Sequence, residues 1–482
     1  MLATMEDLPN EILGQIFELC VDEDVDMPSR LANSYQSNDY PSAPLDTTKA
    51  PWVLSHVSSR WRGLALSSPG LWTAFDINWL DRDDEKDLPY IETLLVLQLE
   101  RCGNQPLSIS WYQISCPKSV HRLLCSKAEQ WTNVTLRSER SGIEWFFGFR
   151  EQFTNITNLH LRFEVHGGDW NGVSQLQEQY GYFFGMFRNT SKLRRLKLSG
   201  DYEVMPYIVP EIPWSQLIHF TAVGLSNGSI RESFFGVLPL IENVKICSLK
   251  TIPLDEAPSG SFTLAHLHTL TLEQESELDS LLNVLVAPSL RSLNLLGWGL
   301  YSFPSLLRLI DRSSCHITHL SIYDIQQHHG CGAFLEFLCA EQLESVEMLE
   351  IASSTLVIPE VLDAFHLPQA TSTLDDKNGV RVVLPQLQSL VIMDIIDDGD
   401  KGSGSGSDDE GSGLELYSSK LVDMLASRTI TGAFSAKVSR LKSLTIRGED
   451  DSFHWFKDPD SIARFEELQR NGLLYSHIVQ NW

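Results

Sequence analysis

The residues best suited to metal chemistry gather between positions 315 and 331. These potential zinc ligands are Cys315, His316, His319, His328, His329 and Cys331. Structural zinc sites use cysteine and histidine, but in tighter pairs than these. His316 and His319 also flank the apolar Ile317, in a segment where polar residues alternate outward. We therefore expect surface histidines, with a zinc site as the alternative, and neither a metal nor a cofactor bound to the chain.

Motifs of common catalytic sites are missing from the sequence. It has no glycine-rich phosphate loop, no Gly-x-Ser-x-Gly nucleophile turn and no His-Glu-x-x-His helix. The formal charge of −26, from 37 basic and 63 acidic residues, repels nucleic acid and anionic membranes over long range. We expect a non-catalytic chain with protein partners and no nucleic-acid partner; an enzyme with an unrecognised site stays open as an alternative.

Cysteine use and apolar runs indicate the compartment. The eight cysteines have no framework spacing, as expected of reduced thiols. Charged residues such as Asp279 and Arg308 interrupt the longest apolar stretches, and the N-terminal residues do not resemble a secretory leader. We expect a cytoplasmic or nuclear protein that does not enter a membrane.

Beyond residue 120 one pattern recurs: an apolar residue, two mostly polar ones, an apolar residue, one further residue and an apolar residue. Copies begin at positions 193, 217, 241, 267, 290, 317 and 343, which differ by 23 to 27 residues, and again at 387 and 441; divergent copies begin at 131 and 156. The last two apolar residues of each copy would lie on one face of a short strand. Intervening segments such as 281–285 and 334–338 have helical character.

This pattern resembles irregular leucine-rich repeats, although it lacks the asparagine that usually closes the turn. The resemblance implies an α/β solenoid over residues 81–482, with short parallel strands alternating with helices. A flexible acidic Gly/Ser loop is expected at 397–413. Outward side chains of the strands would bind a protein substrate, or would simply be solvated. The candidates are Arg194, Arg195, Lys197, His268, Arg291 and His319.

Two amphipathic segments precede the repeats. The first follows Pro9, and its apolar residues recur every three to four positions up to Phe17. The second spans about 51–66 and has the apolar Val57, Trp61 and Leu64 on one face. The intervening residues 21–50 are acidic and contain several prolines, which predicts a flexible insert.

Three blocks of these segments resemble an F-box over residues 1–80: Leu8-Pro9-x-Glu11-Ile12-Leu13-x-x-Ile16-Phe17, Val57-Ser58-x-x-Trp61-Arg62-x-Leu64-Ala65 and Pro69-x-Leu71-Trp72. In that family a helical module docks onto a Skp-type adaptor, which connects to a cullin and its RING subunit. The resemblance implies the substrate-recognition subunit of a cullin-based, SCF-type ubiquitin ligase. Its adaptor-binding residues would be Leu8, Pro9, Ile12, Leu13, Ile16, Phe17, Val57, Trp61 and Leu64.

Two alternatives to this interpretation remain. In the first, which we favour less than adaptor binding, the helices are a cap that covers the end of a repeat array, since terminal repeats need a polar outer face. The whole chain would then be a leucine-rich-repeat scaffold that binds a protein partner without ubiquitin ligation.

Overall fold

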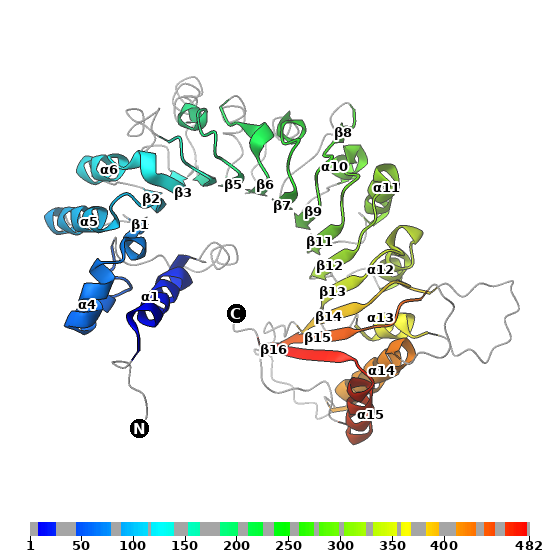
Figure 1. Ribbon diagram of the computed structural model, residues 1–482. Coiled ribbons are helices and arrows are strands. Elements are labelled where there is room, and N and C mark those ends of the chain that lie inside the picture. The colour runs from blue at the N-terminus through cyan, green and yellow to red at the C-terminus, as the bar shows by residue number, and fades with distance from the viewer. Residues whose placement is uncertain are drawn as a thin grey trace, which may run out of the picture. The chain divides into compact units, whose positions relative to one another are not determined.

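Short parallel strands and helices alternate along the chain in the computed structural model (Figure 1). The structure describes residues 8–25, 45–78, 88–113, 117–138, 153–163, 184–200, 211–224, 236–250, 260–273, 279–297, 303–323, 331–353, 358–367, 382–394, 411–429, 438–448 and 458–479. The chain divides into two units, Met1–Val237 and Leu238–Trp482. Among the described residues, no helix has the length and apolar character needed to cross a membrane.

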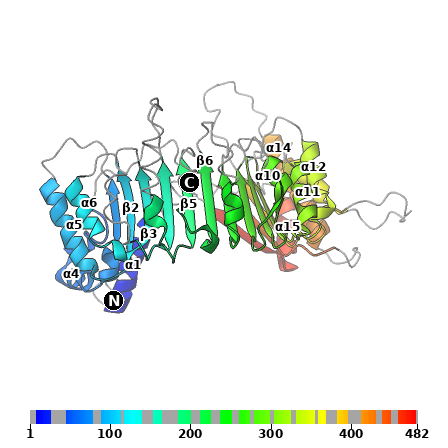
Figure 2. The same cartoon turned by 90° about the horizontal axis from the view of Figure 1, so that it is seen from above.

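The first unit begins with helices and continues with parallel strands that pair in chain order, side by side in Figure 2. Its helices are α1 (Asn10–Val25), α3 (Leu54–Val57), α4 (Ser59–Leu66), η2 (Pro69–Trp72), α5 (Leu88–Cys102), α6 (Lys118–Cys125), η3 (Ala128–Gln130), η5 (Gly185–Phe187) and η7 (Trp214–Gln216). Its strands are β1 (Ala74–Asn78), β2 (Leu107–Gln113), β3 (Trp131–Ser138), β4 (Asn158–Phe163), β5 (Arg195–Gly200) and β6 (His219–Gly224).

The repeated apolar residues meet in rows across these strands. Leu159 pairs with Val134 and Leu196, and Leu196 pairs with Phe220. All of these side chains are buried. A shift of one residue would turn such a row to the opposite face, so the apolar pattern fixes the register. Helix α6 packs on the same face as this row, where His121 contacts Trp111 with ring centroids 5.1 Å apart.

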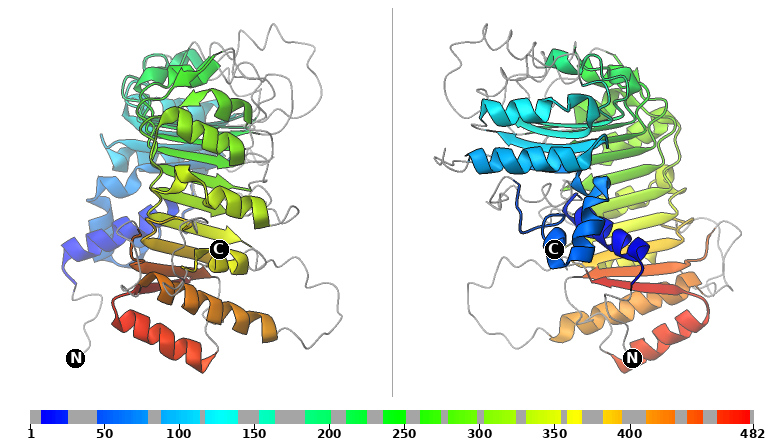
Figure 3. Two further views of the ribbon diagram at one scale, coloured as in Figure 1. Left: turned by 90° about the vertical axis from the view of Figure 1, so that its right-hand side faces the viewer. Right: turned by 60° about the vertical axis from the view of Figure 1, so that its left-hand side comes forward.

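The second unit repeats the arrangement, and its helices cover one face of its strands (Figure 3). The strands pair in the order β7 (Ile246–Lys250), β9 (Thr269–Glu273), β11 (Ser292–Leu296), β12 (His319–Tyr323), β13 (Met348–Ser353), β14 (Ser389–Asp394), β15 (Ser443–Gly448) and β16 (Leu474–Val479). A separate pair is β8 (Phe262–Thr263) with β10 (Leu285–Val286). The helices are η8 (Leu238–Leu240), α10 (Asp279–Val284), α11 (Phe303–Ser313), α12 (Cys331–Leu338), η11 (Glu341–Leu343), α13 (Ile358–Phe365), α14 (Gly411–Thr429) and α15 (Pro459–Arg470).

One backbone contact recurs where the strands begin. The carbonyl of Arg291 accepts hydrogen bonds from the N–H groups of Thr318 and His319, at 2.8 and 3.0 Å. The carbonyl of Thr157 does the same for Arg194 and Arg195, at 2.8 and 3.1 Å. These contacts satisfy backbone groups that would otherwise be left unpaired at the turns, and they fix the stagger between neighbouring strands.

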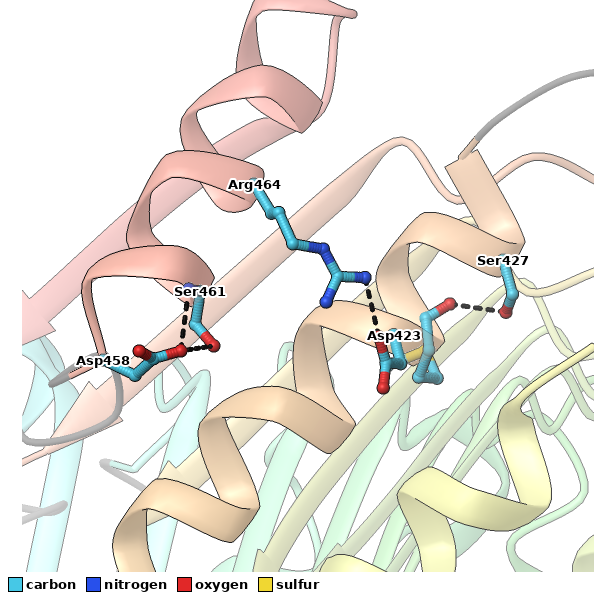
Figure 4. A network of polar contacts seen from close by, with 6 residues as sticks. Asp423, Ser427, Asp458, Ser461 and Arg464 are labelled. Carbon is cyan, nitrogen blue, oxygen red and sulfur yellow. Dashed lines mark hydrogen bonds and ion pairs between the residues drawn. The ribbon is translucent and has the colours of Figure 1, made fainter.

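Polar contacts hold the last helices of the second unit in place. Figure 4 shows Arg464 of α15 beside Asp423 of α14, with Nη2 and Oδ1 2.6 Å apart. Asp458 caps α15, because its carboxylate accepts from the backbone N–H and the hydroxyl of Ser461 at 3.0 and 2.9 Å. The buried Arg428 of α14 donates to the carbonyl oxygens of Phe365, Leu384 and Val383. Its burial lowers the pKa of the guanidinium to about 10.

The structure confirms the α/β class with parallel strands and helices. Most strands of the Leu-x-x-Leu-x-Leu copies lie where the pattern predicts them, and the helical segments at 281–285 and 334–338 overlap α10 and α12. The register is wrong for the copies at 241 and 343: Ile246 and Met348 are exposed, and the buried rows of β7 and β13 are Cys247 with Leu249 and Leu349 with Ile351. The predicted loop at 397–413 lies outside the described residues except for 411–413, which begin α14. The predicted insert at 21–50 also lies outside them at 26–44, while 21–25 complete α1. A domain boundary at residue 80 stays a prediction.

Candidate protein-binding site

Helices α1, α3, α4 and η2, here called the helical segment, contain the residues predicted to bind an adaptor. The single helix expected at 51–66 is wrong, because the chain is extended at Ser58, with φ −156° and ψ 167°. The hydroxyl of Ser58 accepts a hydrogen bond from the N–H of Trp61 at 3.2 Å and so caps α4. Val57 therefore lies at a corner between two short helices.

The core of the helical segment uses part of the predicted set. Leu13 and Phe17 are fully buried, and the Phe17 and Trp61 ring centroids lie 4.9 Å apart. These contacts hold α1 against α4. Leu13 and Phe17 thus stabilise the segment.

Arg60 ties the beginnings of α1 and α4 together. Its Nε and Nη2 donate to Oδ1 of Asn10 at 3.0 and 2.8 Å, and Nη2 also donates to the carbonyl oxygen of Leu8. Pro9 and Val57 are close in sequence to these partners, and both are exposed. The bonds therefore bring Pro9 and Val57 to the same end of the helical segment.

Large apolar side chains remain on the surface of the helical segment. The exposed fraction is 42% for Ile12, 57% for Val57 and 64% for Leu19. Ile12 and Leu19 are seven residues apart, which places them on one face of α1. Val53 and Leu66 are exposed as well. These exposed side chains, here called the apolar surface, lie in or next to helices that pack on one another, α1 on α4 and α3 on α4, and are a candidate protein-binding site.

The predicted adaptor-binding residues thus divide into three sets. Pro9, Ile12 and Val57 are exposed, and Leu13 and Phe17 are in the core. The partly exposed ones are Leu8, Ile16, Trp61 and Leu64. Sequence reasoning missed Leu19, although its spacing of seven from Ile12 continues the same stripe.

Trp72 joins the helical segment to the strands. Its Nε1 donates to the carbonyl oxygen of Ala65 at 2.8 Å, and its ring meets that of Trp52 edge to face at 5.1 Å. The guanidinium carbon of Arg101 in α5 lies 4.3 Å from the centre of the Trp72 ring and 4.8 Å from that of Trp52. Gln98 of α5 donates to the carbonyl oxygen of Ala74 in β1 at 2.7 Å. These contacts fix the orientation of η2 against α5 and β1.

The predicted substrate-binding residues form two groups, one in each unit. Arg194 and Arg195 are exposed and Lys197 is half-buried, on or just before β5. In the second unit His268, Arg291 and His319 are exposed at the starts of β9, β11 and β12. Arg195, Lys197 and His319 alternate with the buried leucines of their strands, on the strand face away from the helices, called here the open face. Arg194, His268 and Arg291 each stand one residue before a strand, at the turn that leads into it.

Further basic residues lie around Arg195 and Lys197. Arg195 pairs across the sheet with His219 of β6, and Lys197 pairs with His160 of β4. Nε2 of His160 lies 2.9 Å from Oγ of Ser199. Burial, Lys197 and Arg162 lower the pKa of His160 to about 3. Burial and Arg195 also lower the pKa of His219, so both histidines are neutral near pH 7.

The open face of the second unit has a different chemistry. Ala352, Val391 and Met393 are buried there, and Tyr323 packs against them. Nη1 of Arg447 pairs with Oε1 of Glu350 at 2.6 Å. Burial and the neighbouring Glu350 raise the pKa of Tyr323 to about 12. Sequence reasoning missed this apolar cluster, although Val391 and Met393 break the polar alternation of their strand.

The possible zinc ligands are only partly described. Cys315 is buried, which raises the pKa of its thiol to about 11, whereas His316 and His319 are exposed. His328 and His329 lie outside the described residues. In the part of the chain that the structure describes, no group of three or more His, Cys, Asp or Glu side chains could hold a metal ion.

No protein-family model matches the sequence of this chain, and none of the curated proteins compared with it is significantly similar.

Proposed function

We propose that this chain is the substrate-recognition subunit of a cullin-based ubiquitin ligase. The helical segment, which resembles an F-box, binds a Skp-type adaptor, and the open face of the repeats, which resemble a leucine-rich solenoid, binds the target protein. The adaptor connects the chain to a cullin and its RING subunit, where ubiquitin is transferred. The chain itself has a non-catalytic role in the cytoplasm or nucleus.

The observation that carries this proposal is the apolar surface of the helical segment. Its core is complete with Leu13 and Phe17 inside, yet Ile12, Leu19 and Val57 stay exposed. Complete burial of such a side chain gains about 1.5–3 kcal/mol, and roughly half of that gain is forgone here because about half of each side chain stays in water. A partner that covers them recovers part of this free energy, which supports a docking role.

The rival function is a cap on the end of the strands. A cap serves to present a polar outer surface to water. The exposed Ile12, Leu19 and Val57 favour adaptor binding over this role.

The experiment is co-purification of the chain with a Skp-type adaptor. Ile12→Asp and Val57→Asp together put two carboxylates on the proposed contact, and we expect at least a tenfold loss of adaptor because buried unpaired charges are costly. The matched control is Val96→Asp with Ile462→Asp, at residues of α5 and α15 that are similarly exposed, at 36% and 39%. Equal recovery of the adaptor by a folded Ile12→Asp, Val57→Asp variant would contradict the proposal.

A further inference from the structure

We propose that the open face of β4 to β6 binds an acidic segment of the target protein in an extended conformation. The surface concerned, called here the basic strip, consists of Arg162, Arg195 and Lys197 with His160 and His219. This inference rests on the proposed function, because it names the chemical class of target that the repeats would select.

Charge is the first argument. The chain has a formal charge of −26, yet the outward residues of β3 to β6, as far as the structure describes them, include no carboxylate. Those residues are Asn133, Thr135, Arg137, Asn158, His160, Arg162, Arg195, Lys197, Ser199, His219, Thr221 and Val223. An acidic chain that keeps one strand face free of acids presents a surface complementary to an acidic ligand.

Geometry is the second argument. Arg195 and Lys197 are alternate residues of one strand, so their side chains leave the same face about 6.6–6.8 Å apart. Alternate residues of an extended peptide have the same spacing. Acidic side chains at every second position of a bound peptide can therefore meet both cations without distortion of either backbone.

The pKa values of His160 and His219 depend in part on the neighbouring cations. Burial is the main cause of the lowered pKa of both histidines, and the neighbouring cations add to it, Lys197 and Arg162 at His160 and Arg195 at His219. His219 is half-buried, so it lies close enough to the surface to sense a ligand. A carboxylate bound beside Arg195 would offset this repulsion and raise the pKa of His219.

An acidic protein segment fits this surface better than a nucleic acid does. A polyanion carries a charge at every phosphate and is repelled over long range by the acidic remainder of the molecule. A short peptide with a few carboxylates extends less far beyond the basic strip and is repelled less.

The test is fluorescence anisotropy of the full chain with a labelled ten-residue peptide of alternating Glu and Ser. We expect Arg195→Glu with Lys197→Glu to weaken binding at least about tenfold, because each change replaces attraction by repulsion. The matched control, Lys118→Glu with Arg122→Glu, makes the same charge change on the exposed face of α6, and we expect less than a twofold effect. An alternating Lys and Ser peptide, which the acidic remainder of the chain attracts, should not be bound more weakly by the Arg195→Glu, Lys197→Glu variant.

Several outcomes would overturn the inference. They are equal weakening by both double variants, tighter binding of a ten-nucleotide single-stranded DNA than of the acidic peptide, and no binding of the acidic peptide. NMR titration of histidine-labelled chain adds a site-specific readout: the pKa of His219 should rise on saturation with peptide, and an unchanged pKa contradicts the inference. The Arg195→Glu, Lys197→Glu variant should still co-purify with the adaptor. Peptide binding therefore tests the basic strip, and co-purification with the adaptor separately tests the proposed function.

Discussion

The helical segment and the strands place their large apolar side chains differently. In the strands Leu293, Leu320 and Ile322 are fully buried, and mostly polar residues alternate with them. In the helical segment Leu19 and Val57 are more than half exposed, beside a core that is already closed. The strands thus bury most of their apolar residues internally; the exceptions among the described strand residues are Ile246 of β7, Met348 of β13, and Leu474 and Ile478 of β16. The helical segment therefore exposes large apolar side chains that its own core does not bury.

The largest expected effect separates core from surface within α1. Phe17→Ala should lower the free energy of unfolding of the helical segment by about 3–5 kcal/mol, because it removes a buried ring that packs on Trp61. Ile12→Ala should cost less than about 1 kcal/mol, because Ile12 is largely solvated. Hydrogen exchange of the α1 amides in each variant measures both. Equal losses of protection in the two variants would mean that Ile12 belongs to the core, and the comparison would fail.

A smaller effect concerns the strands, whose open face buries a titratable group. The pKa of His160 is about 3 in the folded chain and about 6.5 in an unfolded one. Between these values the unfolded chain binds more protons, so stability falls as the pH decreases below about 6.5 and is unaffected by His160 above it. The loss should be about 1.4 kcal/mol for each pH unit well inside this window.

Urea unfolding at pH 7.5 and 5.0 of the wild type and of His160→Gln measures this effect. The variant should lose less stability on acidification than the wild type does. His121 and His219 titrate in both proteins, so the difference isolates His160. Identical losses in the two proteins would show that His160 takes up a proton without penalty in the folded chain.

The strands were predictable because one physical rule determines them. Each Leu-x-x-Leu-x-Leu copy needs its last two apolar residues on one side, and only a stack of parallel strands buries all copies together. Strands β2 and β16 were missed because Leu107-Ser-Ile109-Ser-Trp111 and Leu474-Tyr-Ser-His-Ile478 alternate without the full six-residue pattern. The strict alternation of residues 107–111 is itself typical of a half-buried strand, so β2 was predictable from it, whereas Tyr475 interrupts the alternation in β16.

The candidate site was predictable only in outline. The apolar stripe of α1 follows from the spacing of its apolar residues. Within it, however, the adjacent Ile12 and Leu13 differ, because Ile12 is exposed and Leu13 is buried. The residue that faces α4 is decided by two features: the extended backbone at Ser58, which ends α3, and the hydrogen bonds of Arg60 to Asn10. The second is a contact between residues far apart in sequence, which the spacing of apolar residues does not predict. The basic strip likewise depends on which strands are neighbours, because Arg162, Lys197 and His219 belong to three different repeats.

Hydrogen exchange of the chain with and without a purified Skp-type adaptor tests the central claim most directly. The account predicts a complex in which exchange slows at residues 8–25 and 51–72 and is unchanged in β11 and β12. Protection confined to the strands, or the absence of a complex with a folded chain, would contradict it.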